Sequence, residues 1–152
     1  MDHGRNRPSP VEWEGDYRGI FDAATDGLII VNLETGFVVE ANPAACAMHG
    51  YTREEFIGLL PEAFIHPGSQ HVFGNSIRAS RPGAVFDTRL LHVRGDGSSF
   101  HAEWRGTPFT FRGRPCLLGV VRDVSRRVQE EQRLRQRVEA RTREQSALLE
   151  VS

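Results

Sequence analysis

The second half of the chain has the pattern of three long strands in succession. Ala84 to Arg94, Ser98 to Phe111 and Pro115 to Val121 are rich in strand-forming residues. Two turn signals separate these runs, Gly95-Asp96-Gly97 and Arg112-Gly113-Arg114. Because such short connections join antiparallel neighbours, the pattern predicts a three-stranded antiparallel meander.

The middle run of the meander has one apolar and one polar face. Its apolar positions are Phe100, Ala102, Trp104, Gly106 and Pro108. They alternate with His101, Glu103, Arg105 and Thr107. Side chains alternate across a strand, so we expect the apolar face to lie on the core.

The first half of the chain predicts short elements. Apolar residues recur at helical spacing from Val11 to Ala24, at Trp13, Tyr17, Ile20 and Phe21. The runs 27–32 and 37–40 predict a hairpin, because turn residues separate them. The 69–80 segment predicts a further helix before Pro82-Gly83.

Capping signals mark two more short helices. Asn42 followed by Pro43 is typical of a helix start, and Gly50 of its end. Thr52 and Glu55 have the spacing of a capping box, and Gly58 would end that helix.

The last 29 residues, 124–152, contain neither Gly nor Pro and are rich in Arg, Glu and Gln. Apolar residues recur at a spacing near 3 to 4, at Val124, Val128, Leu134, Val138 and Leu148. Polar residues take the core-like positions Glu131, Arg141 and Gln145. At ~1.5 Å per residue such a helix is about 40 Å long, too long to cover a small sheet. We expect it to pair with a second copy or to lead into a further domain, and the uncapped end predicts that the natural chain continues.

Composition narrows the function classes. The 19 basic and 20 acidic residues give a formal charge of -1, which argues against a dedicated nucleic-acid binder. No apolar stretch approaches the ~20 residues of a membrane span, and the N-terminus is polar, so we expect a cytoplasmic protein. Cys46 and Cys116 are too few for a disulfide framework and fit buried packing positions.

Several segments together resemble a PAS sensor domain of the bacterial sensor histidine kinase type. The matching segments, in order, are Phe21 to Ile29, Glu40 to Ala45, Gly50 to Gly58, Ile65-His66-Pro67, Arg94 to Ser98, and Val121 to Ser125. The tail around Gln136 to Glu144 resembles the helical linkers that join such domains to GAF modules and kinase cores. The predicted organisation is a disordered leader (1–10), a flanking helix (11–24), a PAS domain (25–123) and a coiled-coil signalling linker (124–152).

The resemblance implies an α+β fold with a five-stranded antiparallel sheet, short helices on one face and a ligand cleft beneath them. It also implies that the signal leaves through the last strand into the exit helix. Asp123 lies where that strand becomes helix, so its carboxylate can cap the first helical amides. Arg122 can pair with a carboxylate of the meander or of a partner chain.

Strand alternation identifies the residues of the cleft. The cleft-side residues are Trp104, Gly106, Leu117, Gly119 and Val121, with Phe64, Phe73 and Ile77 opposite. Gly106 leaves room there, whereas Trp104 can stack on a planar ligand or fill the space as core. The sequence therefore leaves a small-molecule ligand and a packed, ligand-free interior both open.

Cofactor signals are weak, and no bound cofactor is the first expectation. Heme on His71 is the alternative, because some PAS oxygen sensors carry their heme ligand on the corresponding helix. Helical geometry instead turns His71 away from the face formed by Val72, Phe73 and Ile77. His66, before Pro67, fits a turn residue. The segment 60–65 lacks the Cys of a light-oxygen-voltage photosensor.

The chain carries none of the sequence motifs of common enzymes and no His in its long helix, so we expect a regulatory domain and not an enzyme. The favoured hypothesis is a sensory and dimerisation module of a histidine kinase, a homodimer through its flanking helices, with GAF or kinase domains downstream. A heme gas or redox sensor and a ligand-free interaction module are the alternatives. We expect no nucleic-acid or membrane partner.

Overall fold

The computed structural model describes residues 10–79 and 84–150. Its elements are α1 (Pro10–Ala23), β1 (Gly27–Asn32), β2 (Val38–Ala41), α2 (Pro43–His49), α3 (Arg53–Phe56), η1 (Pro61–Ala63), η2 (Pro67–Ser69), α4 (Gln70–Arg78), β3 (Phe86–Val93), β4 (Ser99–Phe111), β5 (Arg114–Asp123) and α5 (Ser125–Glu150). All predicted strands and helices are present. The predicted leader falls on residues outside the description, apart from Pro10, where α1 begins.

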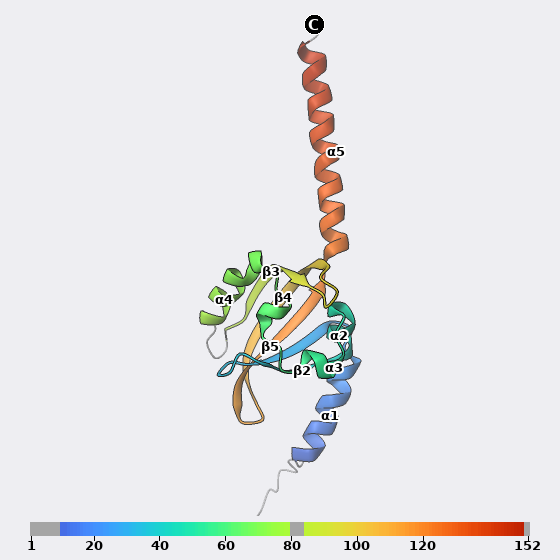
Figure 1. Cartoon of the computed structure of the whole chain (residues 1–152). Helices are drawn as coiled ribbons and strands as arrows, with labels where there is room; N and C mark the ends of the chain where they lie inside the picture. The colour runs from blue at the N-terminus through green and yellow to red at the C-terminus, as the bar shows by residue number, and fades with distance from the viewer. Residues whose placement is uncertain (1–9, 80–83, 151–152) are drawn as a thin grey trace, which may run out of the picture.

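The five strands form one antiparallel sheet in the order β2-β1-β5-β4-β3, as Figure 1 shows. The β3–β4 and β4–β5 hairpins and the β1–β2 pair are those that the sequence predicts. β1 pairs with β5, and Gly27 lies opposite Val121. This pairing joins strands from opposite ends of the domain sequence and completes the sheet. The expected α+β fold with a five-stranded antiparallel sheet is therefore confirmed.

The two faces of the sheet are covered differently. On the inner face Ala45 of α2, Phe56 of α3 and Phe73 of α4 pack into one buried cluster with Ile29 and Trp104. On the outer face α1 contributes a smaller cluster, in which Tyr17 and Phe21 pack on Ile30 and Cys116. Trp13 lies outside the residues whose side chains are described. The ligand cleft implied by the resemblance belongs to the inner face.

The predicted caps hold the inner helices in place. Asn42 accepts the amide of Ala45 at the start of α2, and Gly50 ends that helix with a positive φ of 72°. Thr52 and Glu55 form the capping box of α3, and Gly58 follows with a φ of 90°. These helices are short and contain few backbone hydrogen bonds, so they depend on their caps for stability.

α5 runs for 26 residues and projects away from the domain as a single rod (Figure 1). Its first turns are anchored, since Val124 and Val128 are buried against the domain. Beyond them Leu134 and Val138 are 63% and 58% exposed. Val124 and Val128 thus pack on their own domain, and the exposed apolar residues of α5 begin at Leu134.

Candidate functional site

A cavity of about 250 Å³ opens between the inner helices and the edge of β1. Its apolar wall includes Val31, Ile65, Phe73 and Ile77, from β1, the segment after η1, and α4. Polar side chains also line it, at Asn32, Glu62, Gln70 and Arg78. We call this cavity the pocket. It lies just below the usual 300–1,000 Å³ of small-molecule sites, so it suits a small ligand.

Two of the eight predicted cleft residues, Phe73 and Ile77, line the pocket. The other six are Phe64, Trp104, Gly106, Leu117, Gly119 and Val121, and all six are buried in the wall and sheet beside it. Phe73 joins the two groups, because its ring lies edge-on against Trp104 with 5.2 Å between centroids. The predicted residues therefore form one continuous inner face, most of which is packed.

Aromatic rings cover both glycines of that face. Gly106 and Gly119 lie opposite each other on β4 and β5. A methyl group added to Gly119 would overlap the Trp104 ring, and one added to Gly106 would overlap Phe86. The room expected above Gly106 is taken by the Phe86 side chain.

A pair of buried histidines lies behind the pocket wall. The Nε2 atom of His49 is 2.9 Å from Nδ1 of His92, and both residues are completely buried. His49 lies in the last turn of α2 and His92 on β3, so the contact joins helix and sheet. The rings of Phe64 and Phe100 pack against both histidines.

The hydrogen bonds determine the tautomer of each neutral histidine. The Nδ1 atom of His49 lies 2.8 Å from the carbonyl oxygen of Ala45, which can only accept, so Nδ1 carries the proton. His49 Nε2 is then an acceptor, and Nδ1 of His92 must donate to it. This arrangement leaves Nε2 of His92 unprotonated, with its lone pair directed away from His49.

Burial also keeps both rings neutral. Burial is the main cause that lowers the pKa of His49 to about 4. Burial, followed by repulsion from His49, lowers the pKa of His92 to about 3. At neutral pH both rings are therefore uncharged, and His92 donates to His49, which in turn donates to the Ala45 carbonyl.

Two buried nitrogen atoms next to the pocket have no hydrogen-bond partner among the residues that the structure describes. They are Nε2 of His92, an acceptor, and Nε1 of Trp104, a donor. The two rings are neighbours, with centroids 5.9 Å apart. Unpaired buried polar groups are uncommon and costly, so this complementary couple calls for an explanation.

Contacts around Asp123 connect the inner helices to the exit helix. Its Oδ1 accepts the amide of Ser125 over 2.9 Å, the expected capping bond of α5. Its Oδ2 lies 3.5 Å from Nη2 of Arg94. The Nε of Arg94 donates to the Met48 carbonyl, next to His49, and its guanidinium lies over the Phe100 ring. Arg94 thus touches the end of α2, the core and the start of α5.

Arg122 pairs with Asp26, at the start of β1, through two hydrogen bonds of 3.2 and 3.1 Å. Within the chain its carboxylate partner is therefore Asp26 and not a residue of the meander, as the sequence had suggested. Asp26 lies in the loop between α1 and β1, and Arg122 is next to the last residue of β5. The ion pair therefore ties that loop to the strand that leads into α5.

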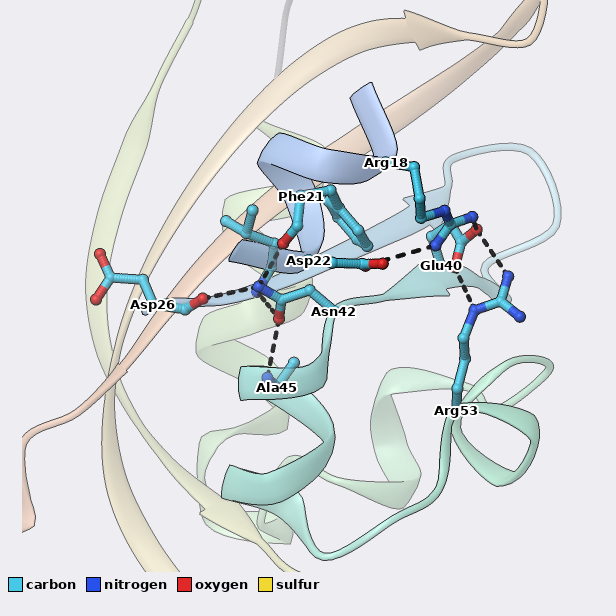
Figure 2. Close-up of polar contacts among 9 residues, drawn as sticks. Arg18, Phe21, Asp22, Asp26, Glu40, Asn42, Ala45 and Arg53 are labelled. Carbon is cyan, nitrogen blue, oxygen red and sulfur yellow. Dashed lines mark hydrogen bonds and ion pairs between the residues drawn. The ribbon is translucent and has the colours of Figure 1, made fainter. Parts of the chain in front are cut away.

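Glu40 and Asn42 attach α1 to the domain, as Figure 2 shows. The buried carboxylate of Glu40 accepts hydrogen bonds from Arg18 of α1 and Arg53 of α3. Burial opposes ionisation, but these bonds hold the pKa of Glu40 below its usual value. The Asn42 amide donates to the carbonyl oxygens of Phe21 and Asp26 over 3.0 Å each.

The other candidate residues lie apart from the pocket. His71 is exposed on α4 and does not line the pocket, and His66 accepts the amide of Gly68 as a turn residue. Cys46 is partly buried on the inner side and Cys116 is buried on the outer side. Within 10–79 and 84–150 no three His, Cys, Asp or Glu residues are grouped so as to hold a metal ion.

Sequence reasoning missed His49, His92, Arg94 and Glu40 as individual residues. One signal was present for His92, since it shares the parity of buried Leu90 in β3. No comparable signal marks His49, because α2 is only two turns long. Their pairing depends on the tertiary fold.

Comparison with known proteins supports the same fold. A family model described as PAS domain matches residues 25–126. A curated relative from Azorhizobium caulinodans, described as an uncharacterized protein, is 32% identical over 124 residues. That alignment covers 76% of this chain and 16% of the relative, so the chain spans about one sixth of the relative's length.

Two solved structures illustrate the similarity. An RNA-binding light-oxygen-voltage receptor superposes with a TM-score of 0.71 and 20% identity, over 94% of this chain and 41% of that one. A domain of the sensory box sensor histidine kinase/response regulator from Geobacter sulfurreducens gives 0.60 and 24%, over 76% and 97%. Among the described residues, no helix is long and apolar enough to cross a bilayer. The sheet order, the capped inner helices and the family match over 25–126 together show that the chain belongs to the PAS domain family.

Proposed function

We propose that this PAS domain is the sensory module of a signal-transduction protein of the sensor histidine kinase type, and that it passes a change at its inner face to α5. The observation that carries the proposal is the position of Arg94. It binds the Met48 carbonyl at the end of α2 and faces Asp123, whose other oxygen caps α5. The likeness to a kinase sensory domain supports the output class.

The mechanism is mechanical. A ligand or partner that shifts α2 relative to the sheet changes the geometry at Arg94, and the capping carboxylate of Asp123 transmits this to the first turn of α5. Val124 and Val128 hold that turn against the domain, so a small change in the sheet alters the direction of the rod. Such a device switches by shifting populations between two orientations.

We further propose that the domain itself is not an enzyme and that it acts as a cytoplasmic homodimer, paired along α5, with GAF or kinase domains after it. Leu134, Val138 and Leu148 are exposed along α5 and supply apolar contacts for a second copy. The near-neutral charge gives no support for a nucleic-acid partner.

A chimera tests the coupling. Residues 1–152 replace the sensor of a well-characterised histidine kinase, joined in helical phase with its dimerisation helix, and autophosphorylation is measured. We expect Arg94→Ala and Asp123→Ala each to change the basal output several-fold in the same direction. Arg105→Ala is the matched control, because Arg105 forms an exposed ion pair with Asp87 that is separate from the Arg94–Asp123 contact. An output that neither Arg94→Ala nor Asp123→Ala alters would refute the coupling.

A further inference from the structure

The two unpaired nitrogens, His92 Nε2 and Trp104 Nε1, form a complementary couple. The hydrogen-bond chain from the Ala45 carbonyl through His49 fixes His92 Nε2 as an acceptor, and an indole Nε1 is always a donor. Both side chains are fully buried. Because the two rings are neighbours, a ligand group that carries a donor and an acceptor on neighbouring atoms has the chemistry that complements both.

The couple lies one side chain behind the pocket. Phe73 lines the pocket on one side and contacts the Trp104 ring on the other. Ile65 also lines the pocket, and its backbone forms a bridge with His92. Phe73 is therefore the side chain that must turn aside for a ligand in the pocket to reach the couple.

α4 is built to allow that movement. All residues of α4 are described, and Phe73 is its single buried side chain. Segments with few buried side chains open at low free-energy cost, so α4 is the element of the inner face that a ligand displaces most easily.

The surroundings also specify the charge of the ligand. The rings that touch His92 and Trp104 are Phe64, Phe73, Phe100 and His49. Charged residues line the pocket at Glu62 and Arg78. The Arg94 guanidinium lies over the Phe100 ring, but it is already paired with Asp123. An ionised group among these rings would lose its hydration without a free counter-charge, so the polar end that binds must be neutral.

We propose that the domain binds a small, flat, uncharged ligand carrying a cis amide or lactam group, whose N–H donates to His92 Nε2 and whose C=O accepts from Trp104 Nε1. The inference rests on the proposed sensory function and names the ligand class for it. His49 is a positioning residue, because it sets the tautomer of His92 without touching the ligand. Displacement of Phe73 is the local change that the binding makes.

NMR of the whole chain labelled with ¹⁵N-tryptophan tests the site, and Trp13→Phe assigns the two indole signals. The probe is 2-pyridone, a lactam, titrated to about 10 mM; N-methyl-2-pyridone, which lacks the donor, is the matched control. We expect a saturable downfield shift of the Trp104 indole proton with 2-pyridone and at least tenfold weaker binding of the control. His92→Phe should abolish the difference between the two probes.

Three outcomes would overturn the proposal. The Trp104 signal stays unmoved by 2-pyridone, both probes shift it equally, or the indole proton shows contact with a bound water that persists throughout the titration. The first two titrations use the unaltered binding residues, so they remain decisive if His92→Phe fails to fold. If the NMR test fails while the kinase chimera shows coupling, only the proposed ligand class is refuted. If the indole signal shifts while the chimera shows no coupling, only the proposed signalling role is refuted.

Discussion

Arg53 holds Glu40 at two points, Nε to Oε1 over 3.0 Å and Nη2 to Oε2 over 2.9 Å, and the carboxylate is fully buried. Arg18 adds a further bond from α1. Glu40 therefore links the flanking helix to the inner helices through a charge that water does not reach. Both arginines are partly exposed and keep some hydration, whereas Glu40 depends on them completely.

This asymmetry predicts that removing an arginine alone lowers the free energy of unfolding more than removing both the arginine and the buried carboxylate. Arg53→Ala leaves a buried carboxylate with one partner and should cost roughly 3 kcal/mol of unfolding free energy. Adding Glu40→Leu should recover part of that loss, because the buried charge is then gone. Urea unfolding measures both, with Arg105→Ala of the exposed pair as a control that costs less than about 1 kcal/mol. A double variant as unstable as Arg53→Ala would contradict this interpretation.

The histidine pair predicts a loss of stability in mild acid. With folded pKa values of about 4 for His49 and about 3 for His92, the unfolded chain takes up protons below its pKa of about 6.5 while the folded domain does not. The free energy of unfolding is therefore unaffected by titration of the pair above about pH 6.5, and it decreases as the pH falls from about 6.5 towards 4. Between pH 7 and pH 5 the two together should remove about 4 kcal/mol.

Urea unfolding at a series of pH values measures this slope. Replacing both residues, His49→Phe with His92→Phe, should flatten it over pH 5–7, provided that the variant retains cooperative unfolding. His71→Ala is the control, because His71 is exposed, and it should leave the slope unchanged. An equal slope in the His71 and histidine-pair variants would show that other groups dominate acid unfolding.

The histidine pair also shows where sequence reasoning stops. Asn42, Gly50 and the Thr52 capping box act within a few residues, so their signals are local and the structure confirms them. The His49–His92 contact spans 43 residues and joins two elements whose packing no local pattern specifies. The inner face of β4 was predictable from alternation, but the Phe86 ring that fills the space at Gly106 comes from the neighbouring strand.

The covered glycines predict a size limit on the inner face. Gly119→Ala should destabilise the domain by about 1–3 kcal/mol, because the new methyl group meets the Trp104 ring, which is itself fully enclosed. Gly19→Ala is the matched control. Apart from the backbone of α1 and the two neighbouring residues, no described atom lies within 4 Å of the added methyl group, so helix propensity should make Gly19→Ala neutral or stabilising by up to about 1 kcal/mol. Thermal unfolding of the two variants compares them, and a harmless Gly119→Ala would mean that Trp104 moves easily.

The last prediction concerns the exposed seam of α5. In the single chain Leu134 and Val138 are more than half exposed, and they are four positions apart, so they lie on one face of the rod. If that face pairs with a second copy, Leu134→Asp should convert a dimer into a monomer, since the charge would be buried against its own symmetry mate. Light scattering after size-exclusion chromatography gives the mass directly. Gln136→Asp introduces the same charge about 200° around the helix from Leu134 and should leave the dimer intact. A monomeric unaltered chain would refute the homodimer. A dimer that survives Leu134→Asp would place the contact elsewhere, with the apolar surface of Tyr17, Ile20 and Phe109 on the outer face as the next surface to alter.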